Sequence, residues 1–182
     1  MDSAFAWLGQ LVEWFGRLIP RWQVLDTTQG AIRYRGGNRP AYCGPGVWWW
    51  WPARDVWQEY PIARQADRLQ TQTIVTTDDK VIVVGGLIVY SVDDLLKLAT
   101  TTFQPSTAVK DLALTAIHDV CCQMTWEELK TEQRKGTLDT KLKNAAQRAL
   151  NDYGVRVLKV MLTDLAPARV LKLMQSMSQE EN

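Results

Sequence analysis

Four consecutive tryptophans, Trp48 to Trp51, constrain the fold of this chain more than any other feature. The run follows Pro45-Gly46 and precedes Pro52, so residues typical of turns mark both of its ends. Successive side chains of a strand point to opposite faces, so a strand here would divide the indoles between two faces. Indole combines an apolar body with a polar N–H and suits a boundary between an apolar phase and water, such as a membrane surface. The alternative from this run alone is a tryptophan-rich protein core.

The first 20 residues predict an amphipathic helix. On a period of 3.6 residues, Glu13 and Arg17 fall in a narrow polar stripe, and Trp7 and Trp14 flank that stripe. A wide apolar face bordered by tryptophan is typical of a helix that lies in the bilayer surface. The segment 4–19 is shorter than the roughly 20 apolar residues of a spanning helix, and two charges interrupt it. The side chains that we expect to contact lipid here are Trp7, Leu11, Trp14, Phe15 and Leu18. The alternative is a helix that packs on the domain or on a neighbouring copy.

The charge of the chain argues against a nucleic-acid partner. It carries 21 basic and 20 acidic residues, a net charge of +1, whereas nucleic-acid-binding domains show a basic patch. Arg33, Arg35, Arg39 and Arg54 lie around the tryptophans in the sequence and could pair with lipid phosphates or with nucleic acid. Four contiguous indoles cannot all face one single-strand groove. We therefore predict no nucleic-acid partner.

The cysteines predict reduced thiols and a cytosolic compartment. Their number is odd, and the adjacent pair Cys121 and Cys122 cannot readily form a disulfide with each other. His118 and Cys122 are four residues apart on a predicted helix, where they could form a nucleophilic pair or supply two metal ligands. No third partner is evident, and Cys43 is distant in sequence. We expect no catalytic residue, no metal and no cofactor.

Short strands separated by turn residues are predicted in the first half of the chain. The candidates are Trp22–Leu25, Ala31–Arg35, Val47–Trp50 and Val56–Tyr60. A longer hairpin follows, with strands Arg68–Thr76 and Val81–Tyr90 joined by a turn at 77–80. Its second strand is apolar on both faces, so we expect it to be central and covered by helices.

The second half of the chain is predicted to be mostly helical. The expected helices are Asp93–Thr100, Thr107–Met124, a short helix that begins with a capping box at 125–128, and Leu138–Tyr153 with Thr137 as its cap. Gly154 ends the last of these, a final strand covers Val155–Asp164, and Pro167 opens a last helix.

The order of these pieces resembles the stomatin/prohibitin/flotillin family, whose shared unit is the SPFH or band-7 domain. The matching pieces are Gly30-Ala31-Ile32-Arg33 followed by Gly36, Pro45-Gly46 with the aromatic strand and Pro52, Thr77-Asp78 with the apolar strand up to Tyr90-Ser91-Val92-Asp93, Glu127-Glu128-Leu129 with Arg134, and Tyr153-Gly154-Val155 leading to Asp164. The resemblance covers about residues 22 to 170. Each motif is weak alone, and the order and spacing together are more specific.

The resemblance implies an α+β fold. A β-rich, membrane-facing subdomain would cover residues 21–92 and an α/β subdomain residues 93–166, after an amphipathic helix at 1–20 and before a helical stub at 167–182. It also implies a non-enzymatic scaffold, associated with the cytoplasmic face of a membrane, that assembles side by side into a homo-oligomeric ring or cage. Such a scaffold would organise a membrane microdomain or restrain a partner membrane protein such as a protease. The loop that matches 45–52 faces the membrane in the family, which implies lipid contact for Trp48, Trp49, Trp50 and Trp51.

Two features depart from the family pattern. Family members usually carry a spanning or hairpin segment at the N-terminus, where this sequence has the amphipathic stretch. They usually continue into a long coiled-coil helix, whereas here the sequence ends at Asn182. We therefore expect oligomers to form laterally, with Val170, Leu171 and Met174 packed on an adjacent subunit. The alternative function is a soluble oligomeric interaction module that uses its tryptophans as protein–protein hot spots.

Overall fold

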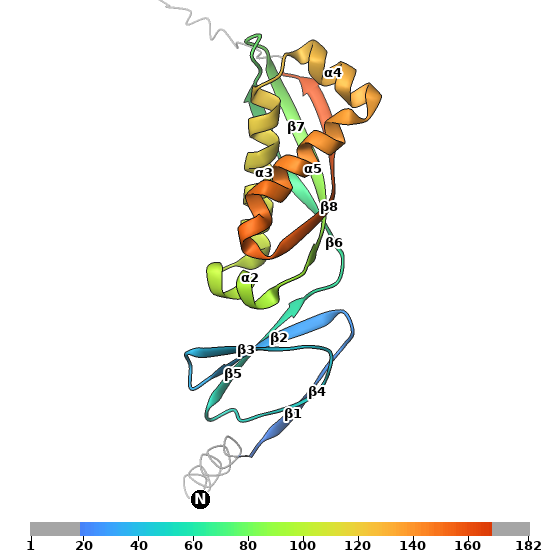
Figure 1. Cartoon of the computed structure of the whole chain (residues 1–182). Helices are drawn as coiled ribbons and strands as arrows, with labels where there is room; N and C mark the ends of the chain where they lie inside the picture. The colour runs from blue at the N-terminus through green and yellow to red at the C-terminus, as the bar shows by residue number, and fades with distance from the viewer. Residues whose placement is uncertain (1–18, 169–182) are drawn as a thin grey trace, which may run out of the picture.

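The computed structural model describes residues 19–168, which form eight strands, four α-helices and one short 3-10 helix (Figure 1). The observed fold is α+β, as the sequence predicts. Several predicted contact residues lie outside the described residues, namely Trp7, Leu11, Trp14, Phe15 and Leu18 of the expected N-terminal helix and Val170, Leu171 and Met174 of the expected stub.

The N-terminal region consists of two small antiparallel sheets. One pairs β1 (Arg21–Leu25) with β4 (Gly46–Trp50), and the other has β2 (Gln29–Arg35) between β3 (Arg39–Cys43) and β5 (Asp55–Pro61). A small core of Leu25, Ala31 and Cys43 lies between the sheets, and Trp48 and Trp57 pack against it. Because this core has few buried residues, the partly buried indoles of Trp48 and Trp57 add to its apolar contacts.

Strand β3 was not predicted from the sequence. It contains Pro40, which lacks the N–H that a central strand needs, and it follows a turn at 36–38. The structure places β3 at the edge of its sheet, paired with β2 alone, where proline is tolerated.

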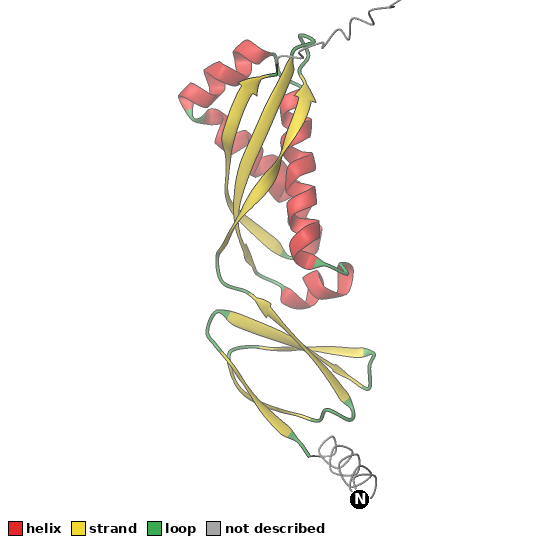
Figure 2. Cartoon of the chain, turned by 180° about the vertical axis from the view of Figure 1, so that it is seen from behind, coloured by secondary structure: helices red, strands yellow, loops and turns green. Residues whose placement is uncertain are grey.

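The C-terminal region is a three-stranded antiparallel sheet covered by helices on one face (Figure 2). The strands are β6 (Gln65–Val75), β7 (Val81–Val92) and β8 (Val155–Pro167), with β7 in the centre as expected. Helices α3 (Pro105–Cys122) and α5 (Thr137–Leu150) pack on Ile82, Val84, Ile88 and Tyr90 of β7. The opposite face of β7 carries Val81, Val83, Leu87 and Val89, all half-buried. The expectation that helices cover β7 therefore holds for one face only.

The predicted helix signals correspond to observed caps. Asp94 caps α2 (Leu95–Thr101), and α4 (Trp126–Lys135) begins with a complete capping box between Thr125 and Glu128. Helix α5 ends at Leu150, earlier than predicted, because the short helix η1 (Asn151–Tyr153) follows it up to Gly154.

The prediction that a last helix begins at Pro167 is wrong. Pro167 is the last residue of β8 and pairs with Ile82 of β7, and the Ala168 N–H then donates to the carbonyl of Val81 at 2.8 Å. Strand β8 lies at the edge of its sheet, so the missing proline N–H costs no ladder bond between the strands.

The division between the two regions differs from the expected boundary at residue 92. The long hairpin β6–β7 pairs with β8 and not with β1–β5, so the break falls between β5 and β6. The regions meet where α2 contacts β2 and β3. At this junction a Cβ on Gly30 would lie 3.0 Å from Ile62 Cγ2 and 3.1 Å from Leu95 Cδ2, so the absence of a side chain allows the close approach.

Candidate functional site

The outward face of the β1–β4 ribbon is apolar and exposed. Trp22 is paired with Trp49, and Val24 with Val47, in the register of the two strands. The two indoles lie with ring centroids 4.8 Å apart and remain 69% and 55% exposed. We use the name tryptophan face for the exposed apolar residues of these two strands together with the exposed residues Ile19 and Trp51, which flank the strands along the chain. Its members are Ile19, Trp22, Val24, Val47, Trp49 and Trp51. Large apolar side chains gathered on one exposed surface mark an interaction site.

The structure divides the tryptophan run between two environments. Trp48 and Trp50 point inward and are half-buried: the Trp48 Nε1–H donates to the carbonyl of Gly44 at 2.7 Å, and the Trp50 ring is stacked 6.2 Å from that of Trp57. Trp49 points outward, and Trp51 follows β4 and is also exposed. Only the second pair presents its indoles to an external partner.

A cavity of about 420 Å³ lies beside the tryptophan face. We call it the arginine cavity; its lining residues are Pro20, Arg33, Arg35, Trp49, Trp50, Trp51, Arg54 and Asp55. The Arg33 Nη1 donates to the carbonyl of Trp49 at 3.1 Å, which ties β2 to β4 across the two sheets. Burial raises the pKa of the nearby Cys43 thiol, and the positive charges of Arg33 and Arg35 partly oppose that rise.

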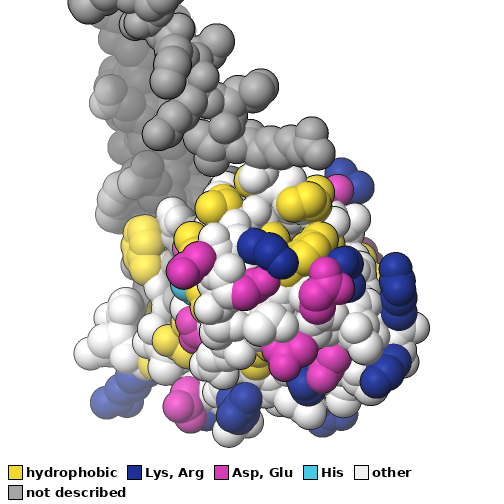
Figure 3. Space-filling model, turned by 90° about the horizontal axis from the view of Figure 1, so that it is seen from above, with side chains coloured by type: hydrophobic (Ala, Val, Ile, Leu, Met, Phe, Trp, Pro, Cys, Tyr) yellow, Lys and Arg dark blue, Asp and Glu magenta, His cyan; other side chains and the backbone are white. Residues whose placement is uncertain are grey.

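The opposite end of the described molecule is polar. Figure 3 shows acidic and basic side chains interspersed over the end that carries α4. The ion pairs here are Lys80–Asp78 at 2.9 Å, Lys130–Glu127 at 2.7 Å and Lys141–Glu132 at 2.6 Å. Since β1 and β4 lie at the other end of Figure 1, the described residues form a molecule with one aromatic end and one charged end.

The environment of Cys122 and His118 does not activate the thiol as a nucleophile. The Cys122 Sγ lies 3.5 Å from the His118 Nε2, but burial and the neighbouring Asp119 raise the pKa of the Cys122 thiol. Burial raises the pKa of Cys121 to about 12. A reactive cysteine needs the opposite shift, because the thiolate is the nucleophile. Within residues 19–168, no three His, Cys, Asp or Glu side chains lie close enough together to hold a metal ion.

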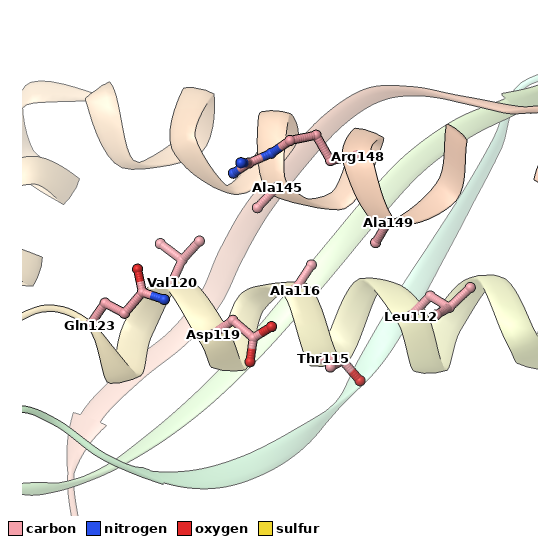
Figure 4. A pocket seen from close by; sticks show the side chains of 9 residues that line it. All are labelled: Leu112, Thr115, Ala116, Asp119, Val120, Gln123, Ala145, Arg148 and Ala149. Carbon is pink, nitrogen blue, oxygen red and sulfur yellow. The ribbon is translucent and has the colours of Figure 1, made fainter. Parts of the chain in front are cut away.

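A second surface hollow lies between α3 and α5. It has a volume of about 320 Å³, and Figure 4 shows Ala145 and Ala149 of α5 opposite Ala116 of α3. Asp119 and Arg148 also line the hollow, and no ion pair joins them within the part of the chain described. The lining is mostly small and apolar and lacks the convergent polar groups of a catalytic pocket.

The fold and the aromatic end together define a class of protein: an α+β domain with one end suited to a membrane surface. The SPFH domain / Band 7 family model matches residues 23–182, and the chain therefore belongs to this family. The resemblance inferred from the sequence is confirmed. Membership indicates in general a membrane-associated, non-enzymatic scaffold. None of the curated proteins compared with the chain matches it. No helix within residues 19–168 is long and apolar enough to cross a bilayer.

Four residues of the tryptophan face were not among the predicted contact residues: Ile19, Trp22, Val24 and Val47. Trp22, Val24 and Val47 follow from two observations together: Trp22 and Val24 alternate along β1, and β1 pairs with β4. The alternation can be read from the sequence. The pairing cannot, because a separate hairpin, β2–β3, lies between the two strands along the chain.

Proposed function

We propose that this chain is a membrane-associated scaffold that docks on a bilayer through the tryptophan face and assembles laterally into a homo-oligomer. The scaffold organises a membrane microdomain or restrains a partner membrane protein such as a protease. The observation that carries the proposal is the exposed cross-strand pair Trp22–Trp49 beside Val24 and Val47.

Contact with a bilayer explains the apolar composition of the tryptophan face better than exposure to water does. Four large apolar side chains on one side of a two-stranded ribbon gain free energy when they leave water. Tryptophan prefers the headgroup level, where its ring is in contact with apolar chains and its N–H with water. Trp51 and Ile19, which flank the two strands along the chain, are also exposed. The predicted N-terminal helix, with Trp7, Leu11, Trp14, Phe15 and Leu18, would add a second lipid contact next to the first in sequence.

Lateral assembly would use surfaces away from the aromatic end. The uncovered face of β7 and the hollow between α3 and α5 are apolar and lie in the C-terminal region. Val170, Leu171 and Met174 follow β8 in the sequence and would add to the contact between neighbouring subunits. Three free cysteines suit the reducing conditions at the cytoplasmic face of a membrane.

Vesicle sedimentation tests the docking surface. In Trp22→Ser combined with Trp49→Ser, we expect the affinity for phospholipid vesicles to fall roughly tenfold or more, because two half-exposed indoles no longer enter the bilayer. Phe103→Ser is the matched control: Phe103 is 97% exposed but lies between α2 and α3, so its loss should leave vesicle binding unchanged.

Two outcomes would contradict the proposal. If the double variant binds vesicles as the wild type does, the tryptophan face is not the docking surface. If the wild type stays in the supernatant and the tryptophans instead capture a soluble protein, the chain is a soluble interaction module.

A further inference from the structure

The arginine cavity is built from two strands and one turn. Arg33 and Arg35 project to the same face of β2, two residues apart, and Arg35 stands opposite Asp55 in the pairing of β2 with β5. Arg54 is brought beside them because the Gly36 N–H donates to its carbonyl at 3.0 Å. Hydrogen bonds from the backbone N–H groups of Arg54 and Asp55 to the carbonyl of Trp51, at 3.0 and 2.7 Å, close the turn.

Three polar atoms of the lining residues are buried without a hydrogen-bond partner: Arg33 Nε, Trp50 Nε1 and Asp55 Oδ1. Leaving such a group unsatisfied lowers the stability of the fold, and a charged group lowers it more. The Arg33 guanidinium is also held in place, since its Nη1 donates to Trp49. Because these three atoms are inaccessible to a water-sized molecule, a ligand in the cavity meets the exposed guanidinium groups of Arg35 and Arg54 instead.

The charge of the cavity selects the ligand. Its lining carries three arginines and one carboxylate, and no ion pair joins Asp55 to an arginine within residues 19–168. The cavity is therefore net positive and open to an anion. Guanidinium groups bind the oxygens of a phosphate through strong, charge-assisted hydrogen bonds.

We propose that the arginine cavity binds the phosphate of a phospholipid headgroup. The exposed guanidinium groups of Arg35 and Arg54 donate to the phosphate oxygens, and Arg33 adds positive charge from the wall of the cavity. The cavity shares Trp49 and Trp51 with the tryptophan face, so a lipid whose chains meet the indoles has its phosphate at the level of the arginines. This inference rests on the proposed docking of the tryptophan face and adds a preference for the lipid that is bound.

The test compares binding to vesicles whose lipid headgroups contain phosphate with binding to vesicles whose headgroups do not. One set contains phosphatidylcholine with phosphatidylglycerol, and the other consists of digalactosyldiacylglycerol, which has a sugar headgroup and no phosphate. The wild type should bind the phospholipid vesicles about tenfold more tightly. In Arg35→Gln combined with Arg54→Gln that preference should disappear, while binding to the glycolipid vesicles is retained. Both arginines are exposed, so the variant should fold.

The matched control removes two positive charges from arginines outside the cavity. Arg64 and Arg68 are exposed and lie outside the cavity, so Arg64→Gln with Arg68→Gln should keep the preference for phospholipid. If both double variants lose the preference for phospholipid vesicles equally, only the net charge of the chain matters, and the proposed binding site is contradicted. Retention of the preference in the Arg35 and Arg54 variant would also overturn it.

A further arm tests the chemical source of the phosphate. Calorimetry with inorganic phosphate distinguishes a lipid from a free anion: binding as tight as that of the vesicles would overturn the assignment to a lipid. If the wild type binds both vesicle types equally, the headgroup site fails and the proposed docking stands. If it binds neither, the proposed function itself fails.

Discussion

At the residue scale, Gly154 fixes the passage from the helices into β8. It has a φ of 70°, and its carbonyl accepts hydrogen bonds from the backbone N–H groups of both Asp93 and Asp94 at 3.0 Å. A Cβ at this position would lie 2.6 Å from the carbonyl oxygen of Asp94. Gly154 therefore meets two requirements at once, a left-handed backbone and a close approach of two chain segments.

We expect Gly154→Ala to destabilise the chain more than Gly136→Ala does. Gly136 has nearly the same φ, 72°, but a Cβ there would have nothing within 4 Å, so its substitution isolates the backbone strain of about 1–2 kcal/mol. The additional clash at Gly154 should raise the loss in the free energy of unfolding by a further 1–3 kcal/mol, roughly. Urea unfolding of the two variants measures the difference, and equal losses would contradict the structural explanation.

The cysteines are expected to contribute packing and no chemistry. Cys121 is fully buried, so Cys121→Ala should lower the free energy of unfolding by about 1 kcal/mol, and Cys122→Ser by less. Because the pKa values of both thiols are raised, alkylation at pH 7 should be slower than that of a free thiol and should accelerate at higher pH. Stoichiometric zinc in the purified protein, detected by elemental analysis, would contradict this account.

At the scale of elements, Asp78 connects the β6–β7 turn to the start of α4. Its Oδ1 accepts hydrogen bonds from Thr76 Oγ1 at 2.6 Å and from the Trp126 N–H at 3.1 Å, and its Oδ2 pairs with Lys80 at 2.9 Å. These partners, the Thr76 hydroxyl and Lys80 first, hold the pKa of Asp78 well below its usual range. One carboxylate thus stabilises two elements that are distant in sequence.

The stability that Asp78 provides should depend on pH with a defined sign. Because its pKa is lower in the folded chain than in the unfolded chain, the contribution is present above the unfolded value of about 3.9 and is lost as the pH falls below it. Asp78→Asn should therefore lower the melting temperature at pH 7, and the difference from the wild type should narrow below pH 4. Asp79→Asn is the control, since Asp79 has a φ of 56°, which asparagine also tolerates. A difference that stays constant with pH would contradict this role.

The sequence predicted elements best where the signal is local. The capping box at Thr125, the stop at Gly154 and the central place of β7 all follow from residues within a few positions of each other. The extension of β8 through Pro167 depends instead on its partner strand. The sequence indicates Arg33, Arg35 and Arg54 as candidates for pairing with lipid phosphates. It does not predict their grouping with Asp55 in one cavity, because that grouping depends on the pairing of β2 with β5.

At the scale of the whole molecule, the aromatic and charged ends define an axis, and the apolar surfaces of the C-terminal region lie between them. Val81, Val83, Leu87 and Val89 are half-buried on the uncovered face of the β6–β7–β8 sheet, and the hollow of Figure 4 lies on the helical side. If the aromatic end rests on a bilayer, both surfaces are directed sideways toward neighbouring copies. Heterologous contacts between copies form a ring when the rotation between neighbours closes.

We expect deletion of residues 169–182 to weaken the oligomer and to leave vesicle binding intact. The deletion removes Val170, Leu171 and Met174 and keeps Ala168, whose N–H completes the pairing with Val81. The tryptophan face lies within residues 19–51, far from the deletion in sequence. Light scattering in mild detergent measures the mass of the assembly, and an intact chain that remains monomeric at micromolar concentration would contradict lateral assembly.

In the proposed docking mode, the tryptophan face enters the bilayer while the α4 end stays in water. Nitroxide labels attached after Val47→Cys and, in a second sample, after Lys135→Cys test it in the vesicle-bound chain, with Cys122→Ser to remove the half-buried native thiol. Electron paramagnetic resonance then measures how accessible each label is to oxygen, which concentrates in lipid, and to a water-soluble nickel complex. We expect vesicles to make the label at 47 more accessible to oxygen and less accessible to nickel, and to leave the label at 135 accessible to nickel. A label at 47 that stays equally accessible to nickel while the protein is bound to vesicles would contradict it.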